Sequence, residues 1–230
     1  MKRIIVAGLM SGLLVACGES TAEVKLDSEI AQVSYGIGVN IGSRFGDEID
    51  LDVDAFSAGV RDAIAGTELK MTEEEIMSTL QAFQQKQMTK RREESQAMSE
   101  TNKAEAEAFM AQNAKVEGVV TTESGLQYQV ITEGTGAKPT AEDTVEVNYE
   151  GKLLDGTIFD SSYKRGQSVS FPVGGVIPGW TEALQLMTVG SKWKLFIPPE
   201  LAYGAGGAGQ MIGPNAALVF DVELISIGEK

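Results

Sequence analysis

The residues best placed to do chemistry lie in the C-terminal half, around the pentapeptide Val176-Ile177-Pro178-Gly179-Trp180. A helix beginning here would offer free backbone N–H groups beside apolar side chains, because the first N–H groups of an α-helix have no internal partners. Trp180 could then form the floor of a hollow. Four other aromatic residues occupy segments from which they could reach the same place: Tyr149, Phe159, Tyr203 and Phe220. These residues predict an apolar, aromatic-walled cavity for a short peptide segment.

The composition excludes several other kinds of site. The 230-residue chain has no histidine, which removes Ser-His-Asp and Cys-His nucleophile chemistry and every histidine-containing metal site. Its formal net charge of −14 argues against nucleic acid as a partner and against adsorption to anionic lipid. The acid excess either keeps the protein soluble or attracts a basic client.

The run Gly204-Ala205-Gly206-Gly207-Ala208-Gly209 contains the G-x-G-x-x-G fingerprint of dinucleotide-binding proteins. That motif requires a helix directly after it, because the helix N-terminus holds the pyrophosphate. Here Met211-Ile212-Gly213-Pro214-Asn215 follows, which is typical of a loop. We therefore expect no nucleotide binding.

Strands are the elements expected to position the aromatic residues. From Gly125 onward the hydrophobic period is two, the period of strands. Asp155-Gly156 stands between two such runs and indicates a two-residue hairpin. One helical pattern begins at Val176, and Gly190 stands where that helix would end. The pattern predicts an α+β domain over residues 116–230, with an antiparallel sheet wrapped round one short helix.

Residues 28–115 have the period of helices. Apolar residues recur at helical spacing from Ile30 to Ile41 and from Phe56 to Ile64, and Gly66 would end the second helix. A third helix from Thr72 to Lys115 would be about 65 Å long, with an apolar stripe only in its first turns. So little apolar area favours a homodimer through residues 28–83 with the long helix as a stalk. The alternative is a monomeric helical cap folded onto the C-terminal domain.

The N-terminus has the pattern of an export signal. Lys2 and Arg3 precede an apolar run, Ile4 to Ala16, that is too short to span a bilayer comfortably. Its end, Leu14-Val15-Ala16-Cys17, resembles a bacterial lipobox, in which the leader is cut before a lipid-bearing cysteine. This predicts a signal peptide over residues 1–16, lipidation of Cys17 and a tether over 17–27. The alternative is a plain leader cut later, for example after Ala22.

The predicted location follows from this N-terminus. About three acyl chains on Cys17 would give stable membrane anchoring, and Gly18 rather than Asp after the cysteine indicates the outer membrane. Cys17 is the only cysteine, so an intramolecular disulfide is excluded. We expect an envelope lipoprotein facing the periplasm or the cell surface, or a soluble periplasmic protein if the plain leader is used.

Five segments of the C-terminal half, in order and at matching spacing, resemble the FK506-binding-protein (FKBP) type of peptidyl-prolyl cis–trans isomerase. The segments are 147–151, 155–162, 176–180, 199–204 and 218–224. Residues 34–38 and 80–83 resemble the N-terminal dimerisation domain of two-domain bacterial members, of the FkpA and macrophage infectivity potentiator type. The resemblance implies the FKBP fold, a homodimer, no cofactor, and macrolides of the FK506 type as inhibitors.

The resemblance also implies the residues of the site, and it places no metal there. By position, the catalytic residues are Asp160, Tyr203, Tyr149 and Phe220, and the substrate-binding residues are Phe159, Arg165, Val176, Ile177, Trp180 and Ile212. Two positions depart from the family: Val169 stands where many members have an aromatic wall residue, and Ala208 lies in a loop where some have histidine or prolines. Asp160 is either a structural partner of Arg165 or acts directly on the rotating carbonyl.

The implied activity is acceleration of X–Pro isomerisation during the folding of exported envelope proteins, without a covalent step. The substrates would be proline-containing unfolded or partly folded polypeptides. Two alternatives remain: a non-catalytic chaperone or adhesion factor that holds clients in the dimer cleft, and a purely structural envelope protein.

Overall fold

The computed structural model describes residues 24–45 and 50–228. The chain divides into two compact units, Met1–Thr72 and Glu73–Lys230. The predicted signal peptide, Cys17 and most of the tether lie outside the described residues. Over the described ranges, no helix is both long and apolar enough to cross a bilayer. The division at Thr72 precedes the long helix, and the domain boundary expected between residues 115 and 116 stays a prediction.

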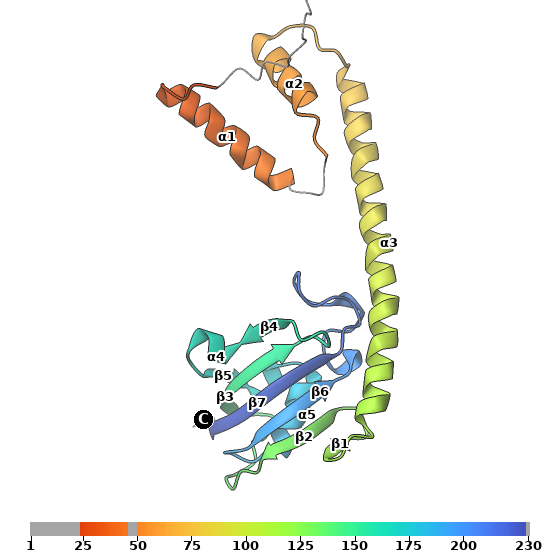
Figure 1. Ribbon diagram of the computed structural model, residues 1–230, viewed down its shortest axis with the longest axis vertical. Helices are drawn as coiled ribbons and strands as arrows, with labels where there is room; N and C mark the ends of the chain where they lie inside the picture. Colours follow the sequence, from red (N-terminus) through yellow and green to blue (C-terminus); the bar gives the residue numbers. More distant parts are fainter. Residues whose placement is uncertain (1–23, 46–49, 229–230) are drawn as a thin grey trace, which may run out of the picture. The chain divides into compact units, whose positions relative to one another are not determined.

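The N-terminal unit contains two helices, α1 (Glu29–Phe45) and α2 (Val53–Ala65) (Figure 1). The Asp52 side chain caps α2 by accepting a hydrogen bond from the Ala55 N–H at 2.9 Å. Gly66 ends α2 in the left-handed conformation, as the sequence predicts. Neither helix buries a single residue. Their apolar faces are therefore unpaired within the described part of one chain.

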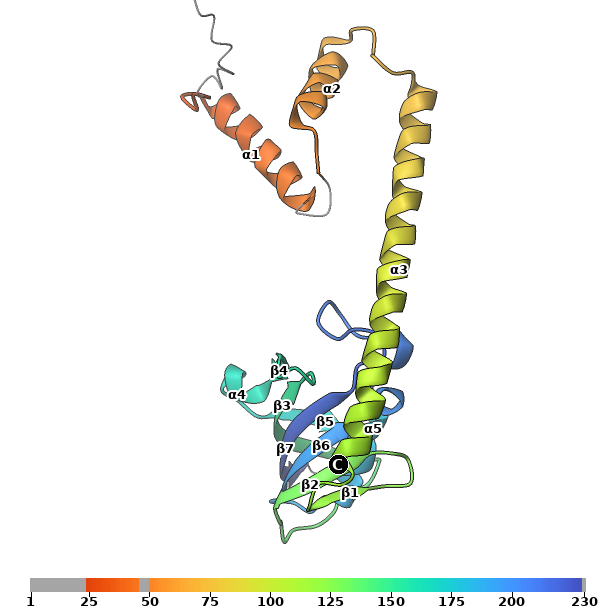
Figure 2. The same ribbon diagram turned by 45° about the vertical axis from the view of Figure 1, so that its right-hand side comes forward.

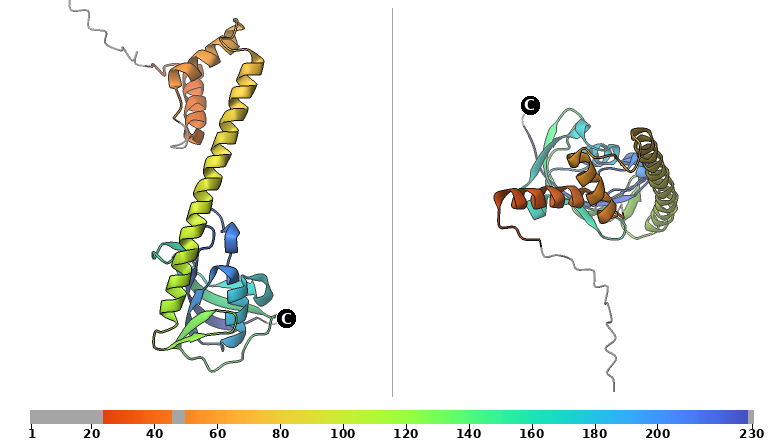
Figure 3. Two further views of the ribbon diagram at one scale, coloured as in Figure 1. Left: turned by 90° about the vertical axis from the view of Figure 1, so that its right-hand side faces the viewer. Right: turned by 90° about the horizontal axis from the view of Figure 1, so that it is seen from above.

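The predicted long helix is present as α3 (Glu73–Asn113), with 41 residues. Most of it is polar and exposed, and its two buried residues are Ala106 and Asn113, near its C-terminal end. This end lies alongside the sheet of the same unit (Figures 2 and 3). There Phe109 packs on Phe196 with ring centroids 5.9 Å apart, and the Asn113 amide donates to the Gln127 side-chain oxygen at 2.8 Å. The C-terminal part of α3 is thus packed against the sheet domain.

The remainder of this unit is the predicted antiparallel sheet with a short helix across it (Figure 1). Among the described residues seven strands pair in the order β1-β2-β6-β7-β3-β4, and β5 pairs with β3. The edge strand β1 has only three residues. The strands are β1 (Val119–Thr121), β2 (Gln127–Thr132), β3 (Thr144–Lys152), β4 (Ile158–Ser161), β5 (Val169–Pro172), β6 (Lys192–Ile197) and β7 (Leu218–Ile227).

The core lies between the sheet and α5 (Pro178–Leu186), whose Ala183 and Leu184 are fully buried. Gly179 allows α5 to approach the sheet, because a Cβ atom there would lie 2.6 Å from Cγ2 of Ile197. The helix ends at Leu186, four residues before the expected Gly190. The next residue, Met187, is extended and fully buried, so the chain leaves the helix to place that side chain in the core.

The remaining elements are single turns that connect the strands. They are α4 (Ser162–Arg165), η2 (Val173–Gly175), η3 (Pro199–Leu201) and η4 (Gly204–Gly206). The G-x-G-x-x-G run, residues 204–209, begins with η4 itself, and no α-helix follows it before β7. The dinucleotide-binding arrangement is therefore absent from this described segment.

Candidate active site

A cavity of about 430 Å³ opens between α5, the sheet and the loops beside them. Its wall contains eight of the ten predicted catalytic and substrate-binding residues, together with Phe171 and Gly175, which the sequence analysis did not identify. The lining residues are Tyr149, Phe159, Asp160, Phe171, Gly175, Val176, Ile177, Trp180, Tyr203 and Phe220. Of the other two predicted residues, Arg165 bonds to the wall from outside, and Ile212 is buried in the core cluster and is not a lining residue.

Trp180 lines this cavity and is only 4% exposed. It is placed there by the start of α5, where Pro178 occupies the first turn with its φ angle already suited to a helix. Three rings contact the indole nearly at right angles, with centroid distances of 5.2 Å for Tyr149, 5.9 Å for Phe171 and 5.3 Å for Phe220. Edge-to-face contacts of this kind add to the stabilisation from burial and fix the ring orientations.

Phe171 reaches the cavity from β5, a strand of only four residues. It pairs with Val145 of β3, and Val169 pairs with Val147. The alternation Val169-Ser170-Phe171 was the signal that could have identified Phe171, because residues two apart in a strand share one face. Many family members have an aromatic residue at the position of Val169. This chain has no ring there, and Phe171, two residues later, contributes a ring to the cavity wall.

Gly151 is a further residue of the site that was not predicted from the sequence. A Cβ atom at this position of β3 would lie 2.6 Å from both Phe159 Cζ and Phe220 Cε1. The two rings meet in a T-shaped contact at 5.5 Å over this glycine. Any larger residue would move the rings, so Gly151 shapes the cavity wall without touching a ligand.

The polar edge of the cavity is a hydrogen-bonded group of Tyr149, Asp160 and Arg165. The Tyr149 hydroxyl donates to Asp160 Oδ2 at 2.5 Å, and Arg165 Nη2 donates to the same hydroxyl at 2.8 Å. Arg165 Nη1 also forms an ion pair with Asp160 Oδ1, and its guanidinium lies over the Tyr149 ring, 5.5 Å from the centroid. Asp160 therefore lines the cavity and is at the same time the partner of Arg165.

Local structure explains how Arg165 returns to Asp160 five residues earlier. The Ser161 hydroxyl caps α4 by accepting from the Lys164 N–H at 3.3 Å, and Gly166 ends the turn at a φ of +74°. One helical turn thus reverses the chain directly after β4, the strand that carries Phe159 and Asp160.

This group keeps its ordinary ionisation near neutral pH. Burial raises the pKa of Asp160, but hydrogen bonds from Tyr149 and Arg165 and the charge of Arg165 outweigh it and hold the pKa below its usual 3.8. Burial, followed by the hydrogen bond to Asp160, raises the pKa of Tyr149. The hydrogen bonds to Tyr149 and Asp160 raise the pKa of Arg165. None of the three is tuned to transfer a proton at pH 7.

Tyr203 also lines the cavity, two residues after η3, and it is 42% exposed. It is therefore open to a bound peptide. The site combines an apolar base with hydroxyl groups at its edge, and no group of ≥ 3 Cys, Asp or Glu residues in the described part of the chain could hold a metal ion.

Comparison with known proteins identifies this arrangement. A family model described as FKBP-type peptidyl-prolyl cis-trans isomerase matches residues 135–225, and the domain amino terminal to such isomerases matches residues 30–130. The chain belongs to the FKBP-type peptidyl-prolyl cis–trans isomerases. It is an enzyme of that type. This confirms the predicted family and activity, and the α+β fold with an N-terminal helical region is confirmed as well. The comparison therefore favours the enzyme over the non-catalytic alternatives.

Relatives match along nearly the whole chain. The peptidyl-prolyl cis-trans isomerase Mip of Coxiella burnetii is 44% identical over all of both chains. The outer membrane protein MIP of Legionella longbeachae is 43% identical over 99% of this chain and 98% of its own. The crystal structure of FkpA from Escherichia coli superposes with a TM-score of 0.67 at 41% identity, covering 88% of this chain and 98% of that one. The match to these relatives therefore includes the helical region.

The pKa values of the cavity group predict that kcat/KM is constant between about pH 5 and 8, because Asp160 stays ionised and Arg165 stays charged over that range. The stabilisation from ionised Asp160 is present above its ordinary pKa and is lost as pH falls through the lower folded value. The measurement is the pH profile of isomerisation of an X–Pro tetrapeptide, with the uncatalysed rate subtracted. A titration midpoint between pH 5 and 8 would contradict this assignment.

Proposed function

We propose that the chain catalyses X–Pro isomerisation in exported envelope proteins by binding the twisted amide in the Trp180 cavity. The observation that carries this proposal is the cavity itself, in which six aromatic side chains surround a space large enough for a proline ring, beside the Tyr149–Asp160–Arg165 group. No proton transfer or covalent step is required of these residues.

The mechanism follows from the electronic structure of the amide. Rotation breaks the resonance of the C–N bond and has a barrier of about 18–20 kcal/mol. In the twisted state the amide has lost conjugation and its dipole is reduced, so an apolar cavity favours it over the planar amide, which is better solvated by water. Binding the transition state more tightly than the ground state lowers the barrier. A million-fold acceleration would require about 8 kcal/mol of such preference.

Each part of the wall has a proposed role in that binding. The rings of Trp180, Phe159 and Phe220 hold the pyrrolidine by burial, with Tyr149 and Val176 beside them. The Ile177 N–H, at the start of α5, and the Tyr203 hydroxyl hold the flanking peptide carbonyls. Asp160, which faces the cavity while paired with Arg165, provides a fixed charge near the rotating carbonyl. FK506-type macrolides would occupy the same cavity as inhibitors, and Ile212 supports the wall from the core.

The combined variant Tyr203→Phe and Asp160→Ala tests these roles. We expect kcat/KM on an X–Pro tetrapeptide to fall at least about tenfold, the loss that corresponds to about 1.4 kcal/mol of transition-state binding. If suppression of client aggregation survives in this variant, chaperone activity is independent of the cavity. A control variant, Tyr163→Phe with Glu123→Ala, changes the same kinds of side chain outside the cavity. Wild-type kcat/KM in the first variant would contradict the proposed roles.

We propose that the enzyme is a homodimer formed through residues 28–83. The support is the number of large apolar side chains left exposed on α1, α2 and the first turns of α3, such as Ile30 at 72% and Ile64 at 83%. Three glycines of α1 also have no atom outside the neighbouring backbone of their own helix within 4 Å of where a Cβ would lie: Gly36, Gly38 and Gly42. A second copy covering these faces would remove the apolar surface from water.

Sedimentation of residues 18–230 tests the dimer. The chain should sediment at about twice its monomer mass, and Ile30→Glu with Ile64→Glu should sediment as a monomer because charges disfavour a buried apolar interface. Val120→Glu, on exposed β1 of the other unit, is the matched control and should remain dimeric. Monomer mass for the unchanged chain would overturn the proposal.

The proposed location is the cell envelope, with Cys17 lipidated and inserted in the outer membrane. The support is the lipobox-like sequence before Cys17 and the outer membrane protein MIP among the relatives. The intact mass of protein extracted from membranes would exceed the mass of residues 17–230 by the acyl groups, and Cys17→Ala would abolish that excess. An unmodified mass starting after Ala22 would support the soluble periplasmic alternative instead.

A further inference from the structure

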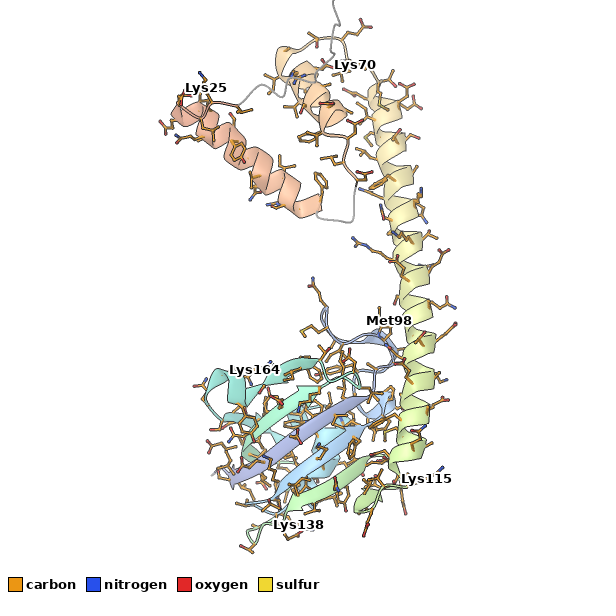
Figure 4. All side chains as sticks on the ribbon, in the orientation of Figure 1. Lys25, Lys70, Met98, Lys115, Lys138 and Lys164 are labelled. Carbon is orange, nitrogen blue, oxygen red and sulfur yellow. The ribbon has the colours of Figure 1, made fainter. Side chains whose placement is uncertain are left out.

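Two side-chain hydrogen bonds attach the loop between Tyr203 and Ala217 to the long helix. Asn102 of α3 donates from Nδ2 to the Pro214 carbonyl at 2.8 Å. Asn215 donates from Nδ2 to Ser99 Oγ, also at 2.8 Å. Figure 4 shows Met98, the neighbour of Ser99, on α3 beside this loop. The contacts join residues more than 110 positions apart in the chain, so they depend on the docking of α3.

The backbone of the loop lies close to α3 at Gly213. A Cβ atom there would be 2.8 Å from Met98 Sδ and 2.9 Å from Asn102 Nδ2. A larger residue there would force the Met98 or Asn102 side chain to move, and a move of Asn102 would disturb its hydrogen bond to Pro214.

Asn215 connects the helix to the active-site wall. It is the only non-glycine with a positive φ among residues 24–45 and 50–228, at 54°. While its side chain reaches Ser99, its backbone N–H donates to the Gly204 carbonyl at 2.8 Å. Gly204 is the residue directly after Tyr203, which lines the cavity. Two successive hydrogen bonds thus lead from α3 to the neighbour of Tyr203.

Apolar packing does not fill the contact between α3 and the loop. A cavity of about 180 Å³ remains there, with Met98, Asn102 and Glu105 on the helix side and Met211, Gly213 and Ala216 on the loop side. Because space is left beside the contact, the directional hydrogen bonds define the position of the loop more strongly than close packing does.

We propose that Ser99 and Asn102 of α3 are positioning residues for isomerisation. They hold Asn215 and Pro214, and through Asn215 they keep the Tyr203 hydroxyl at the wall of the cavity. Neither residue touches substrate. The inference rests on the proposed role of Tyr203 and gives the C-terminal part of α3 a function in catalysis.

The experiment is a set of double-mutant cycles in the full-length chain, with kcat and KM measured on an X–Pro tetrapeptide. Tyr203→Phe is combined with Ser99→Ala plus Asn102→Ala, and separately with Asn215→Gly. Asn215→Gly removes the side-chain hydrogen bond but keeps the backbone donor and the left-handed conformation, so it tests the proposal even if the α3 variant does not fold. Ser95→Ala plus Gln96→Ala, exposed on the same helix, is the matched control.

We expect the α3 variant and Asn215→Gly each to lower kcat about threefold to tenfold, with little change in KM. When Tyr203→Phe is added to either variant, the additional fall in kcat should be much smaller than in the wild-type chain, or absent. Ser99→Thr, which keeps the acceptor hydroxyl, should retain the wild-type kcat, and the control should show the full effect of Tyr203→Phe. If the α3 variant and Asn215→Gly have the same kcat as the control variant, or if Tyr203→Phe lowers kcat equally in every background, this inference is overturned and the proposed role of Tyr203 is unaffected. If Tyr203→Phe leaves kcat unchanged in the otherwise intact chain, the proposed role of Tyr203 fails first, and the inference fails with it.

Discussion

The edge-to-face packing of Trp180 is the interaction on which the active site depends. The indole lies under Tyr149, Phe171 and Phe220, three rings that come from three different strands. Each strand can present its ring at that point only if the sheet register is correct and α5 lies close to the sheet. Gly179 allows α5 to approach Ile197 of β6, and Gly151 leaves room for the rings of Phe159 and Phe220, because a Cβ atom at either position would clash with these side chains. The cavity is thus a product of the whole fold and not of one loop.

The charges at the edge of the cavity are arranged so that they do not disturb its apolar base. Asp160 lies beside the aromatic rings with 43% of its side chain exposed, and without a partner its carboxylate would lose part of its hydration there. Arg165 and the Tyr149 hydroxyl satisfy both of its oxygens. The arrangement leaves a fixed dipole next to a water-poor space, which suits a reaction that changes the polarity of an amide without moving a proton.

Much of this could be predicted from sequence because the signals are local. Gly66 ends α2 and Asp155-Gly156 lies in the turn between β3 and β4, as the residue types at those positions indicate. The expected two-residue hairpin is wrong, because residues 153–157 lie between the paired Lys152 and Ile158. Phe171 was missed because β5 has only four residues, and its place in the wall depends on pairing with β3. The contacts of Ser99 and Asn102 could not be predicted either, since polar residues on an exposed helix give no periodic pattern to indicate where another segment will dock. Ile212 was predicted to line the cavity, but it is buried in the core cluster, and its backbone pairs with that of Ala208.

The most direct test of the apolar-cavity mechanism is to locate the proline ring of a bound substrate. Nuclear Overhauser contacts can be measured between an isotope-labelled X–Pro peptide and the full-length enzyme, while cis–trans exchange of the peptide is followed in the same sample. The account predicts contacts from the proline ring to the Trp180 indole and none to Trp193, which is stacked on Tyr128 with a centroid distance of 4.2 Å. Catalysed exchange without any contact between proline and Trp180 would contradict it.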